Sequence, residues 1–308
     1  MAFKSDQISN IKESHCTRKK VNNFFGGKEV WWALFFFTIL ASLLSPNFFT
    51  KFNITNLLTQ SSIYGTLAIG QFLVILSGGY DLSVAAILAL SSCIIAKYAP
   101  VNIYLFIFIG IFVGMLIGLI NGLTITYGKV PAMIATLATA GIARGLAFNT
   151  TSHAISVDHP IIKKLNSSVW IFSWSTIIWI VLVVLFSLFL NFTKTGTYIY
   201  AVGGNEDTAR LAGIRTKYIK CLVYIMSGFV SGIGGFLYVI RSTSGVPHIG
   251  TGWELDTIAS VIIGGTKLNG GVGNLPSAMA GVLIYMLIRN ALNIIALDPY
   301  YQDIIKAF

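Results

Sequence analysis

Charged residues are scarce in this chain. Asp, Glu, Lys and Arg make up only 10% of its 308 residues, whereas hydrophobic residues make up 55%. A soluble domain needs far more polar surface than this to cover its core, so the composition predicts an integral membrane protein. The few charges are mostly basic, with a formal net charge of +10. In a protein with many spans, basic residues typically mark cytoplasmic loops, so we interpret the excess as a topology signal and expect no nucleic-acid partner.

Residues that build reactive or metal-binding sites are also few. The three cysteines and four histidines are widely spaced, without a C-x-x-C pair, and support neither a disulfide framework nor a zinc site. The glycine-rich stretch from Gly264 to Gly273 lacks the G-K-[ST] ending of a phosphate-binding loop. No Ser/His/Asp set or carboxylate pair stands out. We therefore expect neither an enzyme nor a bound cofactor.

Long apolar stretches dominate what is present, and several approach the roughly 20 residues that cross a bilayer as a helix. They lie at about 30–45, 54–76, 82–99, 103–127, 131–150, 171–191, 221–240, 255–265 and 275–294. No small-residue cleavage site follows the first stretch, so it is expected to be a retained span and not a signal peptide. The prediction is an all-α, polytopic membrane protein with about nine complete spans.

Two basic clusters set the expected orientation. One lies in the tail at 1–29, the other at 192–220 within the membrane domain 30–308, and six predicted spans separate them. Both should face the cytoplasm. The segment 304–308 looks like the opening of a tenth span, so the chain is expected to stop inside that span.

A polar segment from Gly203 to Arg215 lies within the second basic cluster. Asn205 is a favourable N-cap, Glu206 places negative charge in the first turn, and Gly213 can adopt the left-handed conformation that closes a helix. Such a helix is too short to be stable alone, so it must dock on something. An ordinary capped surface helix is the plainer alternative.

Two other segments interrupt the apolar stretches. Gly78 and Gly79 precede Asp81 and Ser83, where Asp81 is placed to cap the next helix with Ser83 in its first turn. The second segment begins near Glu254 and Asp256 and ends in the glycine run that starts with Gly264 and Gly265. Short hydrophobic segments bounded by glycine in two halves of a chain favour an internal repeat around a central path. A capped re-entrant turn is the structural alternative for the first segment.

Polar and small residues within the spans form a third group. Gln71, Asn121 and Arg144 are expected to face protein or water and are candidates for lining a translocation path. Glycines recur every four residues at Gly110, Gly114, Gly118 and Gly122, which places them on one helix face for close packing.

Three segments resemble the permease subunits of ribose-type ABC sugar importers. Y-I-Y-A-V-G-G-N-E-D-T-A-R-L-A-G-I at 198–214 resembles the family's cytoplasmic coupling loop. G-G-Y-D-L-S-V at 78–84 resembles G-x-D-L-S-V-G, although Ala85 stands where glycine is usual. Residues 252–273 match G-x-E-L-D-x-I-A and G-G-T-x-L-x-G-G-x-G, with Trp253 and Lys267 larger than expected.

The resemblance implies a type II-like ABC importer permease in a bacterial inner membrane. Its implied partners are an ABC ATPase subunit, an extracytoplasmic sugar-binding protein and a second, identical or different permease subunit. The implied coupling residues are Gly203, Gly204, Asn205, Glu206, Ala209, Arg210, Ala212, Gly213 and Ile214. Candidate residues for the path or for broken helices are Gln71, Gly78, Gly79, Asp81, Ser83, Asn121, Arg144, Glu254, Asp256, Gly264 and Gly265. The cargo would be a ribose-type monosaccharide or a related sugar.

An ion-coupled secondary carrier is the alternative function. Such a carrier needs ionisable residues within the membrane to carry protons or sodium. Asp81 and Arg144 are the two residues that support it.

Overall fold

The structure is a computed structural model that describes residues 27–44 and 46–294. Helices form most of this part of the chain. They are α2 (Lys28–Leu44), α3 (Lys51–Leu76), α4 (Val84–Thr126), α5 (Ala132–Thr150), α6 (Pro160–Leu165), α7 (Trp174–Phe192), α8 (Lys194–Gly204), α9 (Glu206–Leu211), α10 (Thr216–Ser242), α11 (Trp253–Ile263) and α12 (Leu275–Ile294). The short strands are β1 (Ile155–Ser156), β2 (Ser168–Val169), β3 (Phe172–Ser173) and β4 (Ser244–Gly245).

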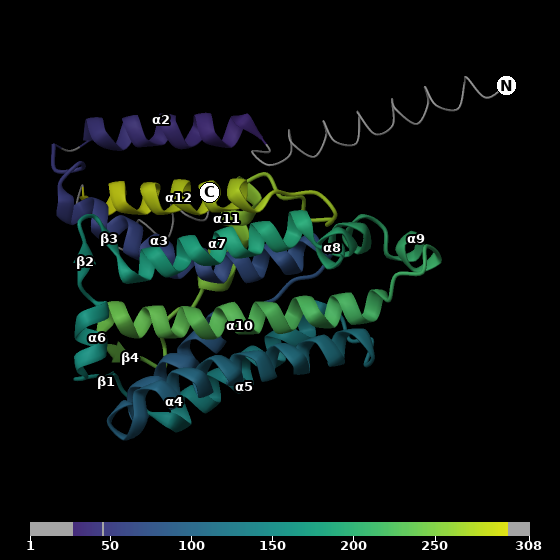
Figure 1. Ribbon diagram of the computed structural model, residues 1–308, viewed down its shortest axis with the longest axis horizontal. Coiled ribbons are helices and arrows are strands. Elements are labelled where there is room, and N and C mark those ends of the chain that lie inside the picture. Colours follow the sequence, from purple (N-terminus) through teal and green to yellow (C-terminus); the bar gives the residue numbers. More distant parts are fainter. Residues whose placement is uncertain (1–26, 45, 295–308) are drawn as a thin grey trace.

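The long helices run nearly parallel to one another and give the bundle two distinct ends (Figure 1). At one end, here called the strand end, β1 pairs antiparallel with β4 and β2 pairs antiparallel with β3. At the other, here called the α9 end, lie α8 and α9 (Figure 1). The segments at 27–30 and 264–274 line one cavity together with Tyr200 of α8, so the first residues of α2 also lie at the α9 end.

Helix α4 is a helical hairpin with two apolar arms. Pro100 lies inside it, and Asn102 has non-helical backbone angles, with φ −164° and ψ 100°. A Cβ built on Gly110 would lie 2.7 Å from Ser91 Oγ, and one built on Gly114 would lie 3.0 Å from Ile87 Cγ2. Residues before the kink therefore pack on residues after it, in antiparallel order. This confirms the predicted division between the stretches 82–99 and 103–127.

The glycines that recur every four residues in α4 pack against α10. A Cβ on Gly118 would lie 2.3 Å from the Tyr224 carbonyl oxygen, and one on Gly228 would lie 2.1 Å from the Gly114 carbonyl oxygen. Only glycine allows the two backbones to approach so closely. The predicted packing role of these glycines is confirmed.

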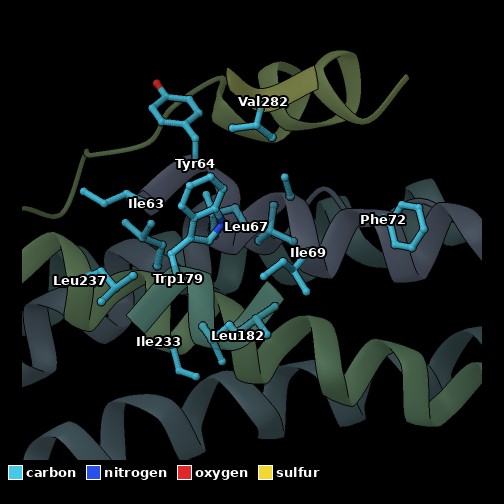
Figure 2. Close-up of a cluster of buried hydrophobic side chains, with 14 of the residues drawn as sticks. Ile63, Tyr64, Leu67, Ile69, Phe72, Trp179, Leu182, Ile233, Leu237 and Val282 are labelled. Carbon is cyan, nitrogen blue, oxygen red and sulfur yellow. The ribbon is translucent and has the colours of Figure 1, made fainter. Parts of the chain in front are cut away.

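The core lies between α3, α7, α10 and α12 (Figure 2). Leu67 and Phe72 of α3 are completely buried, and Leu237 of α10 packs in the same cluster. Trp179 of α7 lies directly over Gly65, where a Cβ would come within 2.2 Å of the indole nitrogen. The middle of α3 is thus enclosed by protein on every side.

Six described helices are long and apolar enough to cross a membrane, namely α3, α4, α5, α7, α10 and α12. Helix α4 counts once although it has two arms, and α2 and α11 are shorter, with 17 and 11 residues. The outer faces of α2, α5 and α7 carry exposed side chains such as Phe36, Leu137 and Leu185, which suit contact with lipid. A multi-pass α-helical membrane protein is confirmed, whereas the total of nine spans stays a prediction. The tail before residue 27 and the expected tenth span lie outside the described residues.

Candidate coupling site

Helix α9 has the caps that its sequence predicts. The side chain of Asn205 accepts a hydrogen bond from the Thr208 N–H at 2.8 Å. Gly213 has φ +83°, and its N–H donates to the Arg210 carbonyl at 3.0 Å. The helix therefore starts and stops where the polar segment indicates, and it stands out from the bundle at one corner (Figure 1).

One face of α9 is seated on the rest of the chain. Ala209, one of the implied coupling residues, is buried within the main core cluster, so its side chain is not part of the exposed face of α9. Glu206 forms a salt bridge with Lys220 of α10, and not with Arg210, which pairs with Asp207 at 2.7 Å. Partial burial would raise the pKa of Glu206, but the hydrogen bond and charge of Lys220 outweigh it, and the pKa lies below its usual range.

The other face of α9 is open. Leu211 is 88% exposed, and Thr208, Arg210 and Ala212 are also exposed. Beside this face lies a cavity of about 750 Å³ between the 125–131 segment and the start of α10. Its charged lining residues are Lys129, Glu206, Arg210, Arg215, Lys217 and Lys220. An apolar side chain next to a basic hollow is suited to contact with a protein partner that carries acidic groups.

Helix α8 precedes α9 and ends against two other segments. A Cβ on Gly203 would lie 1.8 Å from the Leu76 carbonyl oxygen and 2.6 Å from the Gly271 nitrogen. A Cβ on Gly270 would lie 2.8 Å from the Gly203 carbonyl oxygen and 2.9 Å from the Gly78 nitrogen. The end of α3, the end of α8 and the turn before α12 thus meet backbone to backbone. We call this contact the glycine junction; its residues are Leu76, Gly78, Gly203, Gly204, Gly270 and Gly271.

Hydrogen bonds hold the glycine junction together. The Gly271 N–H donates to the Leu76 carbonyl at 2.9 Å. Tyr200 of α8 donates through its hydroxyl to the Gly273 carbonyl at 3.1 Å. The two glycine-bounded segments that the sequence singled out are therefore joined at the α9 end, although the internal repeat itself stays a prediction.

Asp81 anchors the first of these segments to α10. Its carboxylate accepts hydrogen bonds from the Ser83 N–H at 2.9 Å, from Ser83 Oγ at 2.5 Å and from Ser227 Oγ at 2.7 Å. The prediction that Asp81 is the N-cap of the next helix is wrong, because Ser83 occupies that position. Asp81 lies two residues earlier and bonds to Ser83 in a local turn, which the short Asp side chain favours. Tyr224, also on α10, donates to the Tyr80 carbonyl at 3.2 Å.

The polar contacts continue across the bundle. Asn121 donates to Ser83 Oγ at 2.9 Å and accepts from Thr139 Oγ1 of α5 at 2.6 Å. Asp81, Ser83, Asn121 and Thr139 are all buried, so their mutual hydrogen bonds keep buried polar groups satisfied. Asn121 thus faces protein, as the sequence predicts for a polar residue in a span.

The remaining candidate path residues lie apart from one another. Gln71 is completely buried in α3, and neither side-chain amide atom has a hydrogen-bond partner among the described residues. Arg144 donates to the Pro247 and Ile249 carbonyls at 2.8 and 2.6 Å and so holds the loop before α11. Glu254 and Asp256 lie in the first turn of α11. A shared pore lining for this set stays a prediction.

Gly264 and Gly265 follow the last residue of α11 and belong to the second glycine-bounded segment. A Cβ on Gly264 would lie 2.4 Å from Ala278 Cα, and Gly265 has φ +85°. Here the backbone of α11 touches that of α12 and then reverses. Close packing and a positive φ explain both glycines.

The sequence did not reveal several residues of this site. The apolar stretches of the sequence do not include 194–204, yet this segment forms α8, with Thr193 as its N-cap and with Ile199 and Val202 buried on one face. That spacing, with a threonine cap, is the signal that could have found it. Lys220 and Ser227 belong to no recognisable motif, because their bonds to Glu206 and Asp81 join segments that are distant in the sequence.

The site is built from contacts between helices. The described residues contain no group of three or more His, Cys, Asp or Glu that could hold a metal ion. What they contain is a docked helix whose position is linked to two helix breaks through backbone contacts, a salt bridge and hydroxyl hydrogen bonds. Helix α9 is thereby connected to the ends of α3, α10 and α12.

Comparison with known proteins gives consistent matches. Residues 53–308 match the family described as "Branched-chain amino acid transport system / permease component". The chain is 37% identical over 288 residues to the ribose import permease protein RbsC of Escherichia coli K12, covering 89% of this chain and 88% of that protein. It is 38% identical over 294 residues to the Bacillus subtilis 168 protein of the same name, covering 89% and 87%. It is 36% identical over 273 residues to the L-arabinose transport system permease protein AraH of E. coli K12, covering 87% and 83%. No solved structure gives a significant match.

Proposed function

This chain belongs to the family of transport-system permease components that matches it from residue 53 onward, and on that premise we propose that it is the membrane subunit of an ABC importer for a monosaccharide. Its relatives are named for ribose and arabinose, so a pentose is the first candidate cargo. ATP hydrolysis is assigned to a separate ATPase subunit, and delivery of the sugar to an extracytoplasmic binding protein. A second permease subunit, identical or different, completes the pore in a bacterial inner membrane.

The observation that supports this function most directly is the seating of α8 and α9. Helix α9 offers an exposed face beside a basic cavity, which suits docking of a partner. Helix α8 ends on the glycine junction, where the two broken segments meet. Closure of an ATPase dimer would move α9, and the glycine junction would pass that motion to α3 and α12.

The same arrangement supports an orientation in which the N-terminal tail and α9 face the cytoplasm. The first residues of α2 and the loop around α9 lie at one end of the bundle, and both neighbour the basic clusters of the sequence. Basic segments stay on the cytoplasmic side. A single cysteine at Thr208 should therefore react with a membrane-impermeant maleimide in inside-out vesicles and not in intact cells, whereas one at Ser167, at the strand end, should show the opposite. Labelling of the Thr208 position from outside cells would refute this orientation.

Reconstitution tests the function. The permease is placed in proteoliposomes with its ATPase subunit and binding protein, and uptake of radiolabelled D-ribose and L-arabinose is followed. We expect uptake of at least one pentose that requires ATP and the binding protein and that survives dissipation of ion gradients. Uptake that needs a proton or sodium gradient and ignores ATP would assign the chain to the ion-coupled carriers.

A further inference from the structure

A cavity of about 680 Å³ is lined by segments of the strand end. These segments lie at the end of the bundle away from α9 (Figure 1). Its walls come from α3, the 165–175 segment and the last turns of α10. The lining is rich in hydroxyl and amide groups, and no carboxylate contributes to it. Pockets of a few hundred Å³ or more with a few convergent polar groups are the usual sites for small molecules.

The lining of this cavity includes a hydroxyl group without a partner. Ser175 is completely buried, and its Oγ has no hydrogen bond with any described residue. The neighbouring hydroxyls are satisfied, since Thr59 Oγ1 bonds Ser173 Oγ at 2.8 Å and Ser173 Oγ bonds Thr176 Oγ1 at 2.9 Å. A buried polar group left unbonded costs stability. A ligand hydroxyl that reaches Ser175 Oγ would remove that cost.

Two further groups reach the cavity from other helices. Arg241, in the last turn of α10, is half-buried and makes no hydrogen bond or salt bridge within the described part of the chain. Asn56 of α3 is half-buried as well, and its amide makes no hydrogen bond within the same residues. A guanidinium group offers five donors, and an amide offers both donors and an acceptor. Phe52, 79% exposed, adds an aromatic ring at the rim.

We propose that this cavity is a monosaccharide-binding site on the permease itself, the first site the sugar occupies after leaving the binding protein. Vicinal hydroxyls of a sugar can bond Arg241, Asn56 and Ser175 together, because these groups supply donors and acceptors from three helices. The Phe52 ring can cover an apolar C–H face of the sugar. This inference rests on the proposed function, since it takes its ligand class from the sugar importers.

Protection of an introduced cysteine tests the site even when binding is weak. Cys16, Cys93 and Cys221 are replaced by alanine, and Ser168→Cys is placed in the cavity wall. Labelling by a membrane-impermeant maleimide is timed in reconstituted permease with and without D-ribose or L-arabinose. We expect one of these pentoses to slow labelling at least three-fold. Ser167→Cys is the matched control, because Ser167 is exposed beside the cavity but does not line it, and its labelling should not change.

Two substitutions, each added to the Ser168→Cys variant, identify the groups that bind the sugar. Ser175→Ala removes a hydroxyl that bonds no described residue and should leave the fold intact, and Arg241→Gln removes the charge. In the Ser168→Cys background each should raise the pentose concentration needed for half-protection at least three-fold. Absence of protection, protection unchanged by both substitutions, or protection by inorganic phosphate in place of pentose would each overturn the sugar site.

The proposed function is measured in parallel, as ATP-driven pentose uptake with the ATPase subunit and binding protein present. Uptake without cavity protection would refute this site alone and leave the importer function standing. Protection without ATP-dependent uptake would refute the importer function and leave a sugar-binding cavity.

Discussion

The carbonyl oxygen of Leu76 accepts a hydrogen bond from the Gly271 N–H at 2.9 Å, and this bond ties the end of α3 to the turn before α12. Helix α8 lies over both partners, with Gly203 against Leu76 and Gly204 against Gly271. Two broken helices and the helix that leads into α9 therefore share one contact. Under the proposed function, such a contact would let a partner seated on α9 act on the interior of the bundle.

Gly203→Ala should destabilise the permease. The new Cβ would lie 1.8 Å from the Leu76 carbonyl oxygen, which is backbone and cannot rotate away. Forced overpacking typically costs about 1–3 kcal/mol, so we expect a melting temperature several degrees lower. Gly204→Ala is the control for stability, because a Cβ there meets no atom within 4 Å. Equal melting temperatures for the two variants would show that α8 does not press on α3.

The sequence predicted the helices of this protein much better than their contacts. The bounds of the expected stretch 275–294 agree with α12, and the caps of α9 at Asn205 and Gly213 are confirmed, because apolar runs and caps are local signals. The burial of Ala209 and the pairing of Glu206 with Lys220 depend on how α10 returns beside α9. No local pattern encodes that return, so the docking face could not be assigned from spacing alone.

The salt bridge between Glu206 and Lys220 should weaken only in acid. The pKa of Glu206 is lowered in the folded protein, so its contribution to stability is complete above the unfolded pKa near 4.5 and is lost as the pH falls through the lower folded pKa. Both side chains are partly exposed, so the pair should be worth about 0.5 kcal/mol. The difference in melting temperature between the wild type and Lys220→Met should be constant from pH 8 to 6 and shrink below pH 4.5. A difference that vanishes by pH 6 would contradict the lowered pKa.

Asp81→Asn should separate the importer from an ion-coupled carrier. An Asn side chain can still accept from Ser83, and its amide can donate to the Ser227 hydroxyl, so the local turn should survive. In an ATP-driven permease, uptake should then stay within several-fold of the wild type. In a carrier that moves a proton or sodium ion through this carboxylate, uptake would be abolished.

Asp81→Ala is the companion variant that tests the structural role of the same residue. It removes the carboxylate that accepts hydrogen bonds from Ser83 and Ser227 inside the bundle. Leaving buried donors unsatisfied costs about 1–3 kcal/mol for each group, so this variant should lose folded protein in a detergent melting assay. Comparable melting of Asp81→Asn and Asp81→Ala would show that the hydrogen bonds at Asp81 contribute little.

Leu211→Asp should uncouple the permease without unfolding it. Leu211 is 88% exposed on α9, so its removal sacrifices little packing within the chain, whereas a charge there would oppose burial against the ATPase subunit. Ala209→Trp is a less specific test, because Ala209 is buried and a Trp side chain would lift α9 off its own bundle. We expect Leu211→Asp to keep the wild-type melting temperature and to lose both co-purification of the ATPase subunit and ATP-driven uptake.

Val169→Asp is the matched control, since Val169 is 56% exposed but lies at the strand end, and it should leave co-purification unchanged. If Leu211→Asp retained the ATPase subunit as well as Val169→Asp does, the exposed face of α9 would not be the docking surface.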